Sequence, residues 1–133
     1  MSQLLFLRSL GAALCTCVAL AACSEDPVAS NRPDCPDAGV ALSVGAGAAP
    51  TFSWTPQCQV SALRIQTAAG DTVFWLVGRD DERLDSPIQY GLVPSGAVET
   101  VPPRPLIAGR SYNAILIQQV GIGRVLATQP FTP

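Results

Sequence analysis

The stretch Thr51-Phe52-Ser53-Trp54-Thr55-Pro56 decides the fold class, because apolar and polar side chains alternate along it. Phe52 and Trp54 fall on one face, which is the period of two of a half-buried β-strand. The short apolar segment 40–44 precedes it, and the glycine- and alanine-rich residues 45–50 separate the two. Such punctuation is typical of a turn, so we expect the two segments to form a β-hairpin.

The same pattern continues through the rest of the chain. In segment 60–67, Leu63 and Ile65 are expected to face inward, and segment 72–77 is apolar on both faces. A strand that is apolar on both faces, such as 72–77, is either covered on both sides or exposes an apolar patch. Further strands are expected at 88–92, 111–120 and 124–131, and the proline-rich segment 97–105 can be at most an edge strand. About seven short strands separated by turns predict an all-β fold, an antiparallel sandwich of two sheets.

Two motifs sharpen this expectation through a resemblance. The stretch from Phe52 to Pro56 resembles the second strand of fibronectin type III domains, whose tryptophan lies between the sheets. The stretch Leu106-Ile107-Ala108-Gly109-Arg110-Ser111-Tyr112 resembles their Leu-x-x-Gly-x-x-Tyr signature. The resemblance implies a fibronectin type III-like or immunoglobulin-like sandwich over residues 37–133, with the Tyr112 hydroxyl bonded back to the preceding loop as a tyrosine corner.

The first 22 residues have the organisation of an export signal. Arg8 precedes the uncharged apolar run 9–20, which is too short to span a bilayer but suits the core of a cleaved signal peptide. The run ends in Leu20-Ala21-Ala22-Cys23, which resembles the lipobox of bacterial lipoproteins. The resemblance implies cleavage before Cys23 and acylation of its thiol and new amine, and several acyl chains give stable anchoring. An ordinary secretory signal with a coincidental cysteine is the alternative.

The residues after Cys23 indicate the membrane to which the protein is sorted and a linker between the membrane and the domain. In the lipoprotein class an aspartate directly after the cysteine favours retention at the inner membrane, and this chain has Ser24 there. The resemblance therefore implies a cell-envelope protein at the outer membrane rather than the inner one. Residues 23–36 are polar and proline-bearing, so we expect a lipid-anchored flexible tether before a domain at 37–133.

Cys35 and Cys58 are the two cysteines left once the signal is removed and Cys23 is acylated. An even pair in an oxidising compartment favours a disulfide. If the hairpin turn centres between Ala46 and Gly47, Cys35 and Cys58 lie opposite one another. A bridge closing a loop of this size contributes about 3 kcal/mol in the chain-entropy view.

Composition excludes several kinds of chemistry. The chain has neither histidine nor lysine, which removes the commonest general base, the imidazole metal ligand and every Schiff-base mechanism. The ten acidic residues against eight arginines give a mild negative charge, which argues against nucleic-acid binding. We therefore expect no metal, no cofactor and no catalytic constellation.

The loop 78–87 concentrates charge, with four acidic residues and two arginines. A calcium site is one interpretation, but the interleaved arginines and the missing EF-hand spacing favour a solvated loop. A hydrolase that uses Asp80, Asp81, Glu82 or Asp85 is the enzymatic alternative, although the chain has no Gly-x-Ser-x-Gly elbow.

The sequence favours a lipid-anchored, non-catalytic binding or scaffolding module that contacts the membrane through its lipid and another envelope protein through its surface. By alternation, four apolar residues lie opposite the core-facing Trp75 and Tyr112 and form the candidate binding surface. They are Phe74, Leu76, Ile115 and Ile117. The alternatives are scattered surface residues, cover by a loop, a permanent subunit of an envelope complex, or glycan stacking on Trp75 and Tyr90. The oligomeric state is left open.

Overall fold

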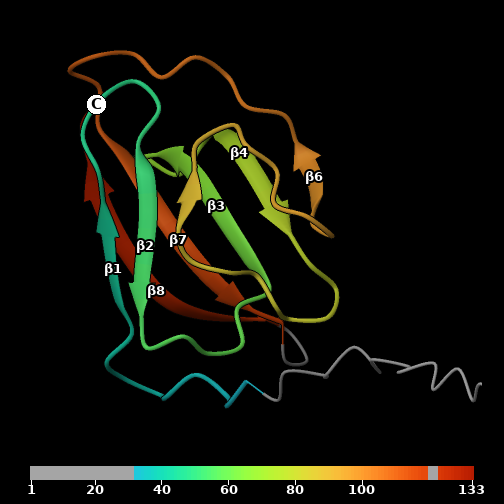
Figure 1. Ribbon diagram of the computed structural model, residues 1–133. Helices are drawn as coiled ribbons and strands as arrows, with labels where there is room; N and C mark the ends of the chain where they lie inside the picture. The colour runs from blue at the N-terminus through green and yellow to red at the C-terminus, as the bar shows by residue number, and fades with distance from the viewer. Residues whose placement is uncertain (1–31, 120–122) are drawn as a thin grey trace, which may run out of the picture. The chain divides into compact units, whose positions relative to one another are not determined.

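The computed structural model describes residues 32–119 and 123–133 (Figure 1). The predicted signal peptide, Cys23 and most of the predicted tether lie outside these residues. Eight strands run through the described part, which has no helix. Their bounds are β1 (Ala41–Val44), β2 (Thr51–Thr55), β3 (Ala62–Thr67), β4 (Val73–Gly78), β5 (Ile88–Gln89), β6 (Val98–Val101), β7 (Tyr112–Gln118) and β8 (Arg124–Phe131).

The strands form two antiparallel sheets that face each other as a sandwich. One sheet has the order β1-β2-β5, and the other has the order β6-β4-β3-β7-β8. The proline-rich segment supplies β6, which lies at an edge of the larger sheet (Figure 1). This placement tolerates prolines 102, 103 and 105. Proline has no N–H to donate to a neighbouring strand, and the chain after an edge strand needs no such hydrogen bond. The predicted all-β, two-sheet fold is confirmed.

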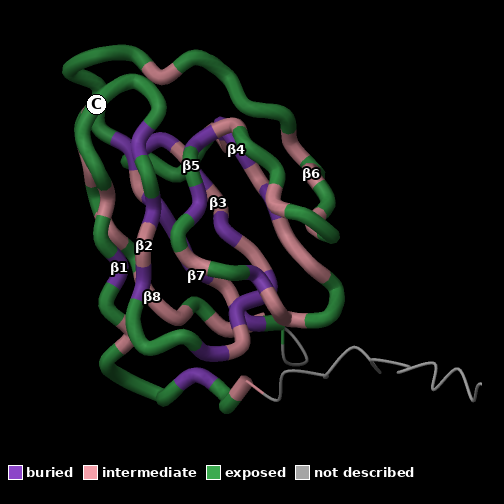
Figure 2. The backbone as a smooth tube through the Cα atoms, in the orientation of Figure 1, coloured by how far each residue is buried: buried purple, intermediate pink, exposed green. Residues whose placement is uncertain are grey.

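The core lies between the sheets and is dominated by aromatic rings. Trp54 and Phe52 enter it from β2, while Trp75 and Tyr112 enter it from β4 and β7. On β3, Leu63 and Ile65 are fully buried between half-buried neighbours, as the alternation predicts. Figure 2 shows this alternation as purple segments on the strands of both sheets. The period of two therefore identifies the inward-facing residues of β2 and β3 correctly.

Phe74 is the exception, and its predicted position on the outer face is wrong. Ile65 pairs with Trp75 but Gln66 pairs with Val73, so Phe74 is an extra residue in a β-bulge. A bulge interrupts the alternation of side chains along a strand. Phe74 is only 7% exposed, belongs to the core and packs edge-on against Tyr112 with ring centroids 5.0 Å apart. Phe74 and Trp75 thus both face inward, although they are consecutive.

The predicted tyrosine-corner contact of Tyr112 is present. The backbone N–H of Ile107 donates a hydrogen bond to the Tyr112 hydroxyl at 3.0 Å. Gly109 adopts a φ of 78° in the intervening turn, a conformation that glycine takes without steric cost. Leu106 packs against the core at the start of the same turn. This contact fastens the loop between β6 and β7 to the sandwich.

The predicted disulfide is present, although the predicted hairpin register is wrong. Leu42 pairs with Trp54, so the turn centres near residue 48 rather than between residues 46 and 47. Cys35 and Cys58 are nevertheless bonded, with their Cα atoms 4.8 Å apart. The approach depends on a separate contact before β1, because the N–H of Gln59 donates to the carbonyl of Pro33 at 3.1 Å.

Residues 32–36, which the sequence places in the flexible tether, are bonded to the sandwich. Arg32 forms an ion pair with Asp85, and the Gln59 side-chain amide donates to the Arg32 carbonyl at 2.8 Å. The Arg124 guanidinium donates to the Cys35 carbonyl at 2.8 Å and pairs with Asp37. These contacts and the disulfide hold the chain at the end of the sandwich where β2 leads into β3.

Candidate functional site

The outer face of the five-stranded sheet carries an apolar surface that the core does not use. Cross-strand pairing aligns Leu76, Arg64 and Ile115 in one row. The next row consists of Gly78, Ala62, Ile117 and Val125, with Val98 of β6 beside Gly78. We call the apolar members of these two rows the outer patch. They are Ala62, Leu76, Val98, Ile115, Ile117 and Val125.

Exposure differs across the outer patch. Val98 and Val125 are 64% and 58% exposed, and Leu76 and Ile117 are half-buried. Ile115 is only 6% exposed although it lies outside the core cluster, so its prediction as an exposed contact residue is wrong. The neighbours opposite it are Arg64 on β3 and Thr128 on β8, so side chains on the same face shield it.

The outer patch contains three of the four residues that the sequence proposed for a binding surface. Leu76, Ile115 and Ile117 lie on this face, while Phe74 lies in the core. Sequence reasoning missed Val98, because prolines mask the strand character of its segment. It also missed Val125, whose position across from Ile117 depends on a register shift between β7 and β8.

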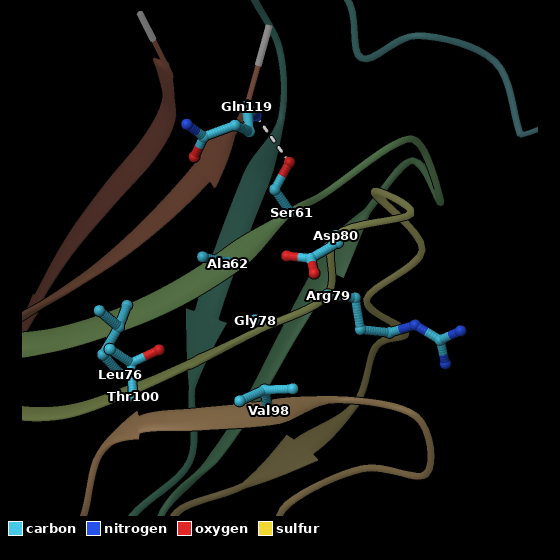
Figure 3. A pocket seen from close by; sticks show the side chains of 9 residues that line it. All are labelled: Ser61, Ala62, Leu76, Gly78, Arg79, Asp80, Val98, Thr100 and Gln119. Carbon is cyan, nitrogen blue, oxygen red and sulfur yellow. Dashed lines mark hydrogen bonds between the residues drawn. The ribbon is translucent and has the colours of Figure 1, made fainter.

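A hollow of about 470 Å³ opens at one end of the outer patch (Figure 3). Its volume lies within the range of small-molecule and peptide side-chain pockets. Its lining residues are Ser61, Ala62, Leu76, Gly78, Arg79, Asp80, Val98, Thr100 and Gln119. We call it the Gly78 hollow.

Gly78 permits the close strand approach beside this hollow. A Cβ atom at position 78 would lie 2.9 Å from the Ser61 carbonyl oxygen, closer than real Cβ atoms come. The Arg79 N–H donates to the same carbonyl at 2.8 Å, and the Ser61 hydroxyl accepts from the Gln119 N–H at 2.6 Å. A glycine at this position therefore lets β4 close tightly on the start of β3.

Two charges flank the centre of the outer patch. Arg64 lies between Leu76 and Ile115, and its Nε is buried without a hydrogen-bond partner among the described residues. Figure 3 shows the Asp80 carboxylate directed toward the Gly78 hollow, while the Arg79 side chain points away from it. Within residues 32–119 and 123–133, neither Arg64 nor Asp80 takes part in an ion pair. The patch thus carries one unneutralised cation and one unneutralised anion.

Three other charges of the 78–87 loop, Arg79, Asp81 and Asp85, are engaged in structural contacts. The Arg79 guanidinium donates to both oxygens of Asp81, at 2.8 and 2.6 Å, and to the Ser95 carbonyl at 2.7 Å. The hydrogen bonds from Arg79 lower the pKa of Asp81 to about 2. Asp85 pairs with Arg32, so two of the carboxylates proposed for hydrolysis, Asp81 and Asp85, are held by different arginines. In the part of the chain that the structure describes, no three acidic or cysteine side chains gather as metal ligands.

The loop is also less solvated than its composition suggests. Leu84 is fully buried, and its N–H donates to the Val60 carbonyl at 2.9 Å. Arg83 forms an isolated parallel bridge with Val60. The middle of the loop is thereby attached to the segment before β3, and only part of it is a free surface.

Trp75 and Tyr90 do not present faces for a glycan. Trp75 is fully buried and donates from Nε1 to a Glu99 carboxylate oxygen at 2.8 Å. Tyr90 packs edge-on against Trp75 and donates from its hydroxyl to the Arg104 carbonyl at 2.8 Å. Burial raises the pKa of Tyr90 to about 12. Both rings are structural, which overturns the glycan-stacking interpretation.

A second apolar concavity lies beside β5. It has a volume of about 380 Å³ and includes Ile88, Leu92 and Val93. Leu92 is 60% exposed, so this region adds apolar surface on the smaller sheet but carries no charged lining residue. No segment of the described chain is a helix of the length and hydropathy that crossing a bilayer requires.

Comparison of the chain with protein-family models, with curated proteins and with solved structures finds no match.

Proposed function

We propose that the protein is a lipid-anchored, non-catalytic binding or scaffolding module of the cell envelope, with a fibronectin type III-like sandwich as its folded part. The lipobox-like stretch ending at Cys23 supports lipid anchoring. The serine at position 24, where an aspartate would favour the inner membrane, supports the outer membrane as the destination. The Tyr112 contact and the buried Trp54 support the fibronectin-like assignment. Since one architecture hosts many functions, the function itself is argued from the surface.

The outer patch is the observation that carries the proposal. Exposed apolar side chains on Val98 and Val125 adjoin the half-buried Leu76 and Ile117 on one sheet face. A contiguous apolar surface of this kind is typical of a protein–protein contact, whereas isolated apolar residues are ordinary. The patch therefore provides the contact surface, and the lipid provides the location.

The binding test compares two surfaces of the full chain in intact cells. Leu76→Ser combined with Ile117→Ser is expected to lower chemical crosslinking to envelope proteins at least fivefold. The control is Ile107→Ser, since Ile107 is 54% exposed and lies outside the outer patch. Equal crosslinking in both variants, with protease resistance showing that both are folded, would reject the outer patch as the contact surface.

The anchoring test uses Cys23→Ser in the full chain. Without the acylated thiol, the chain is expected to lose incorporation of labelled fatty acid and to leave the membrane fraction, because multiple acyl chains provide the stable anchoring. Continued lipid labelling in the variant would exclude Cys23 as the site of acylation.

A further inference from the structure

We propose that the outer patch binds a second copy of this chain, face to face, about a two-fold axis that passes over the Ala62–Gly78 pair. The proposal rests on the proposed function in two respects, the outer patch as a contact surface and the lipid anchor that brings copies together. It adds the identity of the partner and the geometry of the contact.

The placement of the two unneutralised charges is the first step. Ala62 of β3 pairs with Gly78 of β4, and the strands are antiparallel. Arg64 lies two residues to one side of this pair on β3, and Asp80 lies two residues to the other side, in the turn that follows β4. The patch therefore has a cation and an anion on opposite sides of a centre made of two small residues.

A two-fold axis between two stacked sheets, running across the strands, exchanges these two sides. Arg64 of each copy then faces Asp80 of the other, so that two equivalent ion pairs form and each charge is neutralised once. An isologous interface requires such self-complementarity, because one surface serves both subunits. Any axis that placed Arg64 against Arg64 would instead bring like charges together.

The cross-strand row that contains Ala62 and Gly78 lies along the same axis. Val98, Ile117 and Val125 belong to the row that contains Ala62 and Gly78. Residues along a two-fold axis meet their own counterparts, so each of these apolar side chains meets an apolar side chain. The small side chains at Ala62 and Gly78 let the sheets approach closely at the centre.

The size of the face predicts a weak dimer that membrane anchoring strengthens. Five strands at about 4.8 Å spacing and about six residues at about 3.3 Å per residue give a face of roughly 24 by 20 Å. That projected area is about 480 Å², which is below the roughly 600 Å² per partner of the smallest specific interfaces. Anchoring two copies in one membrane raises their effective concentration, which compensates for a small interface.

The experiment uses the full chain in intact cells, with cysteine crosslinking at the axis. Val125→Cys is expected to form a disulfide-linked dimer under mild oxidation, because position 125 meets its own counterpart. Ile107→Cys is the matched control, since it is comparably exposed but lies off the patch. It is expected to give at least fivefold less dimer.

Charge exchange then tests the geometry in the Val125→Cys background. R64E and D80R are each expected to reduce the dimer at least fivefold, because each places like charges face to face. Coexpression of the two variants is expected to restore a heterodimer, since all four charges then pair across the axis. The R64E/D80R double variant is expected to restore the homodimer for the same reason.

The outcomes separate this inference from the proposed function. Absence of the Val125→Cys dimer, or failure of coexpression to restore it, overturns the homodimer. If crosslinking to another envelope protein still depends on Leu76 and Ile117 in that case, the proposed binding function is retained and the partner is a different protein. Loss of both results would reject the outer patch altogether.

Discussion

The two faces of the five-stranded sheet differ in what holds their side chains. On the inner face Leu63, Trp75 and Tyr112 are fully buried, and the indole and the hydroxyl both have hydrogen-bond partners. On the outer face Leu76 remains half-exposed, and Arg64 has a buried nitrogen without a partner among the described residues. The fold itself buries the side chains of the inner face and pairs their polar groups. The outer face leaves apolar surface and polar groups that a binding partner can cover.

The largest expected effect comes from truncating matched leucines on the two faces. Leu63→Ala removes a fully buried side chain and should cost about 2–5 kcal/mol of unfolding free energy. Leu76→Ala, on the neighbouring strand but the outer face, should cost less than about 1 kcal/mol, because much of its surface is already in contact with water. Urea unfolding of both variants measures the difference. Equal losses would show that another segment covers the outer face.

The disulfide tests how strongly the segment before β1 is tied to the sandwich. Replacing Cys35 and Cys58 together by alanine should lower the unfolding free energy by about 3 kcal/mol, given the sequence separation of 23 residues. The outer patch lies on other strands, so its crosslinking behaviour should persist wherever the variant is folded. Thermal unfolding of the variant beside the oxidised parent provides the measurement. Unchanged stability would mean that the polar contacts of Arg32 and Gln59 suffice.

The tyrosine-corner contact contributes a smaller amount to the inner face. Tyr112→Phe keeps the buried ring but removes the hydroxyl that accepts from the Ile107 N–H. The expected loss is about 1 kcal/mol, the net value of a typical intramolecular hydrogen bond. Hydrogen exchange at the Ile107 amide should increase together with this loss. A variant as stable as the parent, with unchanged exchange at that amide, would contradict the assigned role.

The last effect is absent at neutral pH and consists of a loss of stability at alkaline pH through Tyr90. Burial raises its pKa from 10.0 to about 12, so the folded state holds the phenolic proton more tightly than the unfolded state. The contribution is therefore fully present below pH 10 and is lost as the pH rises from 10 toward 12. Lysine does not obscure this window, because the chain has none. Unfolding free energies across the window should decline less steeply in Tyr90→Phe, and identical slopes would remove Tyr90 as the cause.

The sequence predicted those features of the fold that depend on the alternation of side chains within a single strand or on composition. The burial of Leu63 and Ile65 follows from local alternation, and the bounds of β8 match the last predicted strand. The Cys35–Cys58 pair follows from counting cysteines under the expectation of an oxidising compartment. Each of these inferences depends on residues close together in the chain or on composition, which a single sequence contains.

The candidate site was predicted only in part, for a specific physical reason. Phe74 faces inward because β4 carries an extra residue relative to β3, and that register is set by pairing between strands. Residues 32–36 are bonded to the sandwich because Gln59, Asp85 and Arg124 come near them. Neither fact can be read from the period of one segment.

The sequence by itself determined the all-β class, the cysteine pair and the absence of histidine and lysine chemistry. It also contains the apolar run that resembles an export signal and the lipobox-like stretch from which anchoring at Cys23 is proposed. The tertiary structure alone decided which apolar residues form the outer patch and that Arg64 and Asp80 flank its centre. Alternation is a property of one strand, whereas a surface is made by neighbours that only the pairing of distant strands brings together.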